Sequence, residues 1–146
     1  MRVIDTGAYI SVLKELVEEG HEVSLLVSGN SMSPFLVNQR DYIYFKRPDR
    51  ELRKGDMVFY QRNTGQYVMH RICRVENNQY YMVGDAQQEI EGPLERGQIF
   101  ALITKAKRKG KIIQKGNFWW EFFEHIWIRV IHHRRILVKT YGILKS

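Results

Sequence analysis

The sequence contains a single cysteine, Cys73, among its 146 residues. An intramolecular disulfide is therefore excluded, and nothing indicates an oxidising compartment. Cys73 lies in an alternating apolar and polar stretch that is typical of a strand, so we interpret it as a buried structural residue rather than a nucleophile. We expect neither a metal ion nor a cofactor.

Long hydrophobic runs are also missing. No uninterrupted apolar stretch reaches the roughly 18 residues that a membrane-spanning helix needs. The first residues lack the basic region, apolar run and small-residue cleavage site of a secretory signal. We therefore expect a protein that is made and kept in the cytoplasm.

Acidic residues are scarce in the last third of the chain. Up to Thr104 there are 12 Lys and Arg against 14 Asp and Glu, a net charge of −2. From Lys105 onward there are 11 basic residues against two acidic ones, a net charge of +9. The basic character of the protein therefore belongs to its C-terminal part.

The pattern of apolar residues predicts a mainly β fold with a helix at each end. Residues 6–19 have apolar side chains at helical spacing, with Gly20 just past the end. The turn sequences Asn63-Thr64-Gly65 and Asn77-Asn78 each predict a hairpin. Short β-branched and aromatic runs predict strands at 22–27, 41–45, 56–61, 66–75, 79–84 and 98–106. We divide the chain into an N-terminal helix (1–21), a β-rich core (22–115) and a basic aromatic helical segment (116–146).

The C-terminal segment has an apolar stripe at helical spacing beside basic residues. The stripe comprises Trp119, Phe122, Phe123, Ile126, Trp127, Val130 and Ile131, and Arg129 and several later Arg, His and Lys residues flank it. This pattern suits an anionic membrane surface or a partner protein. Packing on the β core or on a second subunit is the alternative. Nucleic acid fits the helical periodicity less well.

One turn combines serine with an unusual neighbour. Residues 28–34 read SGNSMSP, in which Ser31 follows a strand-like run and Pro34 stiffens the exit. A catalytic serine needs a positioned base, and Gly29 would allow backbone N–H groups to approach a substrate carbonyl. His70, in the alternating run YVMHRICRV, is a candidate base, although a half-buried histidine of the core is the ordinary explanation for such a residue.

Four segments together resemble the S24/S26 serine peptidases, and among them the type I signal peptidases. They are SGNSMSPFL, RKGDMVFY, YVMHRICRV and YYMVGDAQQEIEG, and the resemblance extends from Val23 to about Thr104. It implies a signal peptidase/LexA-like β-rich catalytic core. It also implies that Ser31 is the nucleophile, that Met32 is a packing residue, and that Gly29, Asn30 and Pro34 belong to the cleft or oxyanion region.

The same resemblance assigns the base and offers two acids. His70-Arg71-Ile72 stands where the Ser-His members of the group have their histidine, and no lysine occupies this position. Asp85, in a Gly-Asp pair, is our first choice for the residue that orients His70, and Glu91 is the second. A capping role in a turn is the alternative for Asp85. We interpret Gly55-Asp56 as a structural turn and expect Arg71 to fix the strand end or pair with an acid.

We therefore predict a serine endopeptidase that cleaves a leader, signal or propeptide by acyl transfer. A LexA-like, DNA-binding regulator that cleaves itself is an alternative, although one short helix is less than a helix-turn-helix needs. A non-catalytic module that binds membrane or nucleic acid is another. With the C-terminal segment on anionic lipid, the enzyme would be peripheral on the inner membrane face.

Overall fold

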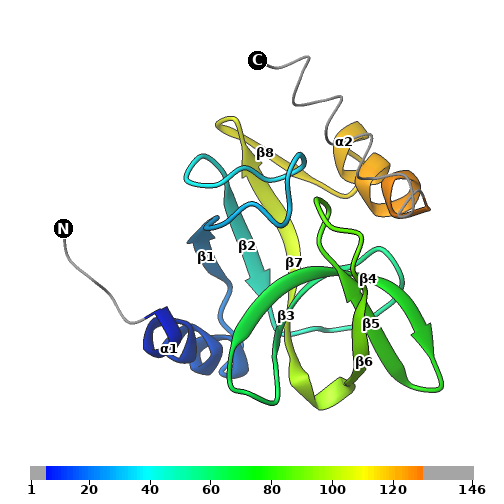
Figure 1. Cartoon of the computed structure of the whole chain (residues 1–146). Coiled ribbons are helices and arrows are strands. Elements are labelled where there is room, and N and C mark those ends of the chain that lie inside the picture. The colour runs from blue at the N-terminus through cyan, green and yellow to red at the C-terminus, as the bar shows by residue number, and fades with distance from the viewer. Residues whose placement is uncertain (1–5, 130–146) are drawn as a thin grey trace.

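The computed structural model describes residues 6–129, which form an antiparallel, strongly curved sheet with a helix near each end (Figure 1). The strand order is β1-β2-β7-β3-β4-β5-β6, and β8 pairs with β7. The strands are β1 (Val23–Leu26), β2 (Tyr42–Lys46), β3 (Met57–Gln61), β4 (Tyr67–Glu76), β5 (Gln79–Val83), β6 (Glu91–Glu95), β7 (Ile99–Arg108) and β8 (Lys111–Gln114). This architecture confirms the predicted mainly β fold.

Both predicted hairpins form at their turn residues. Asn77 and Asn78 adopt φ angles of 52° and 61° between β4 and β5. Asparagine tolerates this left-handed region better than most residues, and two such residues in succession match the twist of the flanking strands. The turn at residues 63–65 joins β3 to β4 in the same antiparallel way.

The predicted N-terminal helix is α1 (Thr6–Glu18). Ile10, Leu13 and Val17 form its buried face, because residues three and four apart lie on the same side of a helix. Gly20 follows the helix with φ of 97°, and its N–H donates to the carbonyl of Val17 at 2.9 Å. Glycine adopts this conformation without strain, so it ends the helix where the sequence predicts.

One hydrophobic cluster joins the three predicted segments. It contains Val17 of α1, Phe45 and Phe59 of the sheet, and Trp120 and Phe123 of the C-terminal segment. That segment begins with α2 (Phe118–Glu121) and continues in a π-helical turn (Phe122–Ile126). The helices at the two ends of the described chain are therefore parts of the core and not appendages.

A second cluster joins side chains of β3 to β7 and includes Val58, Tyr60, Ile72 and Met82. Strand β6 was not predicted, because its sequence EGPLE combines charge with glycine and proline, which strands disfavour. None of the helices in residues 6–129 is both long and apolar enough to cross a bilayer.

Candidate active site

Ser31 lies in a turn that is held in place by buried neighbouring side chains and by backbone hydrogen bonds. The turn follows β1, and its neighbours Met32, Phe35 and Leu36 are each no more than 1% exposed. The N–H of Leu36 donates to the carbonyl of Met32 at 2.9 Å, and that of Ser33 donates to Asn30 at 3.1 Å. Met32 is therefore the packing residue that the sequence predicts, and Ser31 is left partly exposed above it.

The serine turn touches the segment that follows β5. The Ser31 carbonyl accepts a hydrogen bond from the N–H of Ala86 at 2.9 Å. A Cβ atom at Gly84 would lie 2.4 Å from the same oxygen, which is closer than real Cβ contacts allow. Only glycine fits at position 84, so the Gly-Asp pair has a steric reason to begin with glycine.

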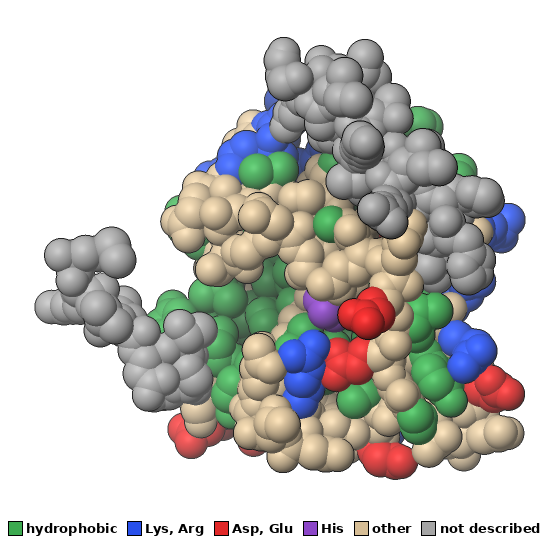
Figure 2. Space-filling model, in the orientation of Figure 1, with side chains coloured by type: hydrophobic (Ala, Val, Ile, Leu, Met, Phe, Trp, Pro, Cys, Tyr) green, Lys and Arg blue, Asp and Glu red, His purple; other side chains and the backbone are tan. Residues whose placement is uncertain are grey.

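The register of the sheet brings His70 to the same place. Arg71 of β4 pairs with Val83 of β5, so His70 and Gly84 are the next residues of the two strands at the end of this ladder. Gly84 is in contact with Ser31, and His70 is thus brought toward the serine turn by strand pairing. Histidine, acidic and basic side chains gather at the centre of the face shown in Figure 2.

A hydrogen-bonded chain orients the imidazole. His70 Nδ1 lies 3.2 Å from the hydroxyl of Tyr60, and this hydroxyl donates to Glu91 Oε1 at 2.8 Å. Because the Tyr60 proton is given to a carboxylate, the phenol oxygen accepts from Nδ1–H. The neutral ring then carries its proton on Nδ1, and its lone pair is on Nε2. This is the tautomer that can accept a proton from a serine hydroxyl.

The far end of this chain is held by an arginine. Arg62 Nε and Nη2 donate to the two oxygens of Glu91 at 2.8 and 2.7 Å. These bonds lower the pKa of Glu91, so it is ionised at neutral pH. Burial, followed by the Glu91 carboxylate, raises the pKa of Tyr60 well above its usual value. Tyr60 therefore remains a neutral phenol between the acid and the imidazole.

His70 is neutral at physiological pH. Its side chain is buried, and burial disfavours the imidazolium, which lowers the pKa to about 4. The negative charge of Glu91 acts in the opposite direction. Among the described residues Nε2 has no hydrogen-bond partner, and it is not one of the fully buried unsatisfied atoms there. An unprotonated ring nitrogen is thus available on β4, beside Gly84 and Ala86, which contact the serine turn.

Asp85 has a different partner from the one predicted. Its two carboxylate oxygens accept from Arg71 Nε and Nη2, each at 2.9 Å, and both side chains are almost fully buried. Within residues 6–129 the carboxylate makes no hydrogen bond to His70. The carboxylate that was our first choice to orient His70 is therefore hydrogen-bonded to Arg71, which occupies both of its oxygens. The expectation that Arg71 pairs with an acid is confirmed.

The backbone N–H of Gly29, which we expected in the oxyanion region, already has a hydrogen-bond partner. Its φ of 92° does require glycine, but its N–H donates to Asn38 Oδ1 at 2.9 Å and is not free for an oxyanion. A Cβ at Gly29 would meet no atom within 4 Å, so the space beside it is open. The N–H of Ser31 makes no hydrogen bond within the described part of the chain. In this turn the backbone N–H of Ser31 is therefore the group that an oxyanion could reach, and Asn30 and Pro34 belong to the same turn.

The predicted aromatic stripe is divided between core and surface. Phe123 and Trp127 are buried, and the Trp127 indole N–H donates to the carbonyl of Asp85 at 2.7 Å. For these two residues the structure shows the alternative that the sequence left open, which is packing on the core. Trp119, Ile126 and Arg129 are exposed and Phe122 is half-buried. Val130, Ile131 and the basic residues after them lie outside the described residues.

Sequence reasoning missed Tyr60 and Arg62. A signal was present, because the hairpin at residues 63–65 pairs Val58 with His70 and Tyr60 with Val68. Side chains two apart on one strand share a face, so Tyr60 had to lie diagonally beside His70. The bond to Glu91 could not be inferred, since β6 was not predicted.

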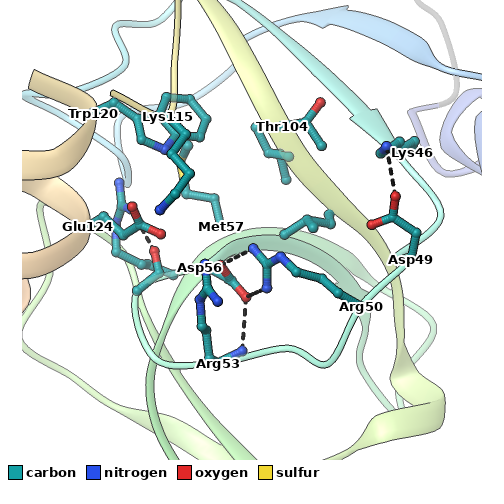
Figure 3. A pocket seen from close by; sticks show the side chains of 14 residues that line it. Lys46, Asp49, Arg50, Arg53, Asp56, Met57, Thr104, Lys115, Trp120 and Glu124 are labelled. Atoms are coloured by element: carbon teal, nitrogen blue, oxygen red, sulfur yellow. Dashed lines mark hydrogen bonds and ion pairs between the residues drawn. The ribbon is translucent and has the colours of Figure 1, made fainter. Parts of the chain in front are cut away.

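The other turn in the resemblance has the structural role expected of it. Asp56, which opens β3, accepts two hydrogen bonds from Arg50 at 2.9 and 2.8 Å and one from the Arg53 N–H. Figure 3 shows these three residues at the edge of a pocket of about 160 Å³. Neither Ser31 nor His70 lines this pocket, so we do not assign it to peptide hydrolysis.

Comparison with known proteins identifies the family. The family model described as Peptidase S24-like matches residues 2–104, and the chain therefore belongs to this family of serine peptidases. No curated protein and no solved structure matches the chain. The match supports the serine peptidase class and leaves the signal peptidase subtype as a hypothesis.

Proposed function

We propose that this protein is a serine endopeptidase of the signal peptidase I-like, Ser-His type. The observation that supports the proposal is the chain Glu91–Tyr60–His70, which sets the imidazole tautomer at the end of the β4–β5 ladder, next to Gly84 and the Ser31 turn. Ser31 would attack the scissile carbonyl while His70 Nε2 takes the hydroxyl proton. His70 would then donate this proton to the leaving amine, and a water would hydrolyse the acyl-enzyme.

A serine-acylating fluorophosphonate probe tests this proposal on the full chain. The probe should label one residue, and peptide mapping should identify Ser31. Incubating the pure protein alone distinguishes the LexA-like alternative, because self-cleavage would produce fragments without added substrate. Labelling elsewhere, or none in folded protein, would contradict the peptidase assignment.

The hydrogen-bonded chain makes a separate prediction about pH. Tyr60→Phe removes the acceptor for Nδ1–H, and we expect kcat/KM to fall about 10²-fold. Activity requires neutral His70, so it should be lost only as the pH falls through about 4. Glu91→Gln removes a charge that raises the pKa of His70, so the acid limb of its profile should move to lower pH. Tyr60→Phe keeps that charge, so its acid limb should stay near that of the wild type.

The measurement is a pH–rate profile with an NMR titration of the His70 ring. Gln61→Ala, one residue further along β3, is the matched control and should keep near wild-type activity. If Tyr60→Phe hydrolyses peptide at the wild-type rate, the chain does not orient the base.

We also propose that the enzyme is cytoplasmic and peripheral on an anionic membrane. Phe118, Trp119 and Ile126 are 68%, 46% and 54% exposed. The guanidinium of Arg108 lies 5.5 Å from the Trp119 ring, which places positive charge next to this apolar surface. Aromatic side chains beside basic residues suit the headgroup region of such a membrane.

Vesicle co-sedimentation tests this localisation. The full chain should pellet with anionic vesicles and be released at high salt. Removing everything after Lys115 would remove buried Trp120 and Phe123, so point variants are preferable. The double variant Phe118→Ser/Trp119→Ser should remain folded and stay in the supernatant, whereas Tyr9→Ser on α1 should still pellet. Equal pelleting of both variants would exclude this surface.

A further inference from the structure

Three potential metal ligands converge at the start of the C-terminal segment. Glu121 ends α2, and Glu124 and His125 lie in the π-helical turn that follows. One ligand atom from each of the three lies within 4.8 Å of the others. π-helical turns occur frequently at functional sites. None of these residues belongs to the hydrogen-bonded chain around His70.

Two carboxylate oxygens in this group are buried and have no hydrogen-bond partner among the described residues. Within the described part of the chain, Glu121 Oε2 and Glu124 Oε2 are the buried side-chain oxygens that accept no hydrogen bond. Glu124 as a whole is 94% buried, with 6% of its surface exposed. An unsatisfied buried carboxylate oxygen is costly, so two side by side call for a cation or a proton between them.

The distances fit a small cation. His125 Nε2 lies 3.3 Å from Glu121 Oε2 and 3.4 Å from Glu124 Oε2. Tetrahedral zinc with bonds of about 2.0–2.2 Å separates its ligands by about 3.3–3.5 Å. Imidazole nitrogen with two carboxylates is a ligand set for zinc, and Mg²⁺ prefers oxygen ligands and retained waters.

The surroundings hold the most buried ligand in place. A Cβ on Gly55 would lie 2.8 Å from Glu124 Cγ, so the side chain rests directly on the turn before β3. Figure 3 shows Glu124 beside Trp120 and Lys115 at one end of the pocket. The neighbouring cation Arg50 donates two hydrogen bonds to Asp56, and among the described residues it makes none to Glu124.

We propose that Glu121, Glu124 and His125 form a zinc site that stabilises the first turns of the C-terminal segment. Three protein ligands leave a fourth position for water. The site is independent of peptide hydrolysis.

The test is titration of the metal-free full chain with ZnCl₂, followed by calorimetry and thermal unfolding. We expect one zinc per chain and a Tm that rises by about 5 °C or more at saturation. MgCl₂ at the same concentration should leave the Tm unchanged.

Ligand variants and matched controls locate the site. His125→Ala should weaken zinc binding by at least about 100-fold. Glu124→Gln should fold normally without metal, since it removes one of two adjacent charges, and should lose the zinc-dependent rise in Tm. His21→Ala, an exposed histidine beside Glu19, should bind zinc like the wild type. The double variant His132→Ala/His133→Ala, outside the described residues, should also bind it.

Three results would overturn the proposal. The first is that no saturable zinc binding occurs, in which case a shared proton satisfies the two oxygens. The second is that His125→Ala and Glu124→Gln bind zinc unchanged. The third is that the His132/His133 variant alone loses binding.

Discussion

Ser31→Ala should reduce peptide hydrolysis by at least about three orders of magnitude while the thermal midpoint stays near that of the wild type. The loss follows because Ser31 is the serine of this turn whose backbone meets Gly84 and Ala86, next to His70 in the strand register. The fold should survive because the Ser31 hydroxyl has no hydrogen-bond partner among the described residues. His70→Ala should cause a similar loss, and Tyr60 would still be bound to Glu91.

Purified variants and a peptide with small residues before the scissile bond provide the measurement. Ser33→Ala, two residues away in the same turn, is the control and should remain active. Wild-type hydrolysis by folded Ser31→Ala would remove the peptidase assignment.

Asp85→Asn should lower the free energy of unfolding by about 3–5 kcal/mol, the largest stability effect that we expect. The reason is that Arg71 is 2% exposed and Asp85 is 0% exposed. Removing the carboxylate charge leaves a buried guanidinium with no compensating anion. Urea denaturation monitored by tryptophan fluorescence measures the change.

Glu91→Gln is the matched control, since it also removes an acid from a bidentate arginine. The Arg62–Glu91 pair has side chains 32% and 29% exposed, so solvent screens it and the loss should be about 1 kcal/mol or less. Under conditions in which all variants are folded, Asp85→Asn should retain more activity than Ser31→Ala. Equal stability losses for Asp85→Asn and Glu91→Gln would contradict the interpretation of Asp85 as a buried structural acid.

The fold was largely predictable because its signals are local. Alternating apolar residues located the β1–β5 and β7 strands, and Asn77-Asn78 located a hairpin. The candidate roles of Ser31 and His70 were predicted from the resemblance to the S24/S26 serine peptidases. The contacts between them depend on strand register, which no single segment of sequence specifies.

The differences between the predicted and the observed site come from contacts between separate segments of the chain. The order of the motifs made Asp85 the first choice for the acid beside His70. In the structure Arg71 is the stronger partner for this buried carboxylate. Tyr60 of β3 was overlooked because it contacts His70 of β4 and Glu91 of β6, and β6 was not predicted. In the C-terminal segment the helical periodicity was recognised, but the residues buried are Trp120, Phe123 and Trp127, a face rotated from the predicted stripe.

The segment from Gly84 to Glu91 connects β5 to β6 and contributes to every part of the site. Gly84 and Ala86 contact the serine turn, Asp85 binds Arg71, and Glu91 begins the chain to His70. The candidate site thus depends on these eight consecutive residues together with the serine turn and the strands β3 and β4. Divergence among such enzymes could then proceed in the remaining loops, where insertions or substitutions would change which peptide is accepted while the proton-transfer residues keep their relative positions.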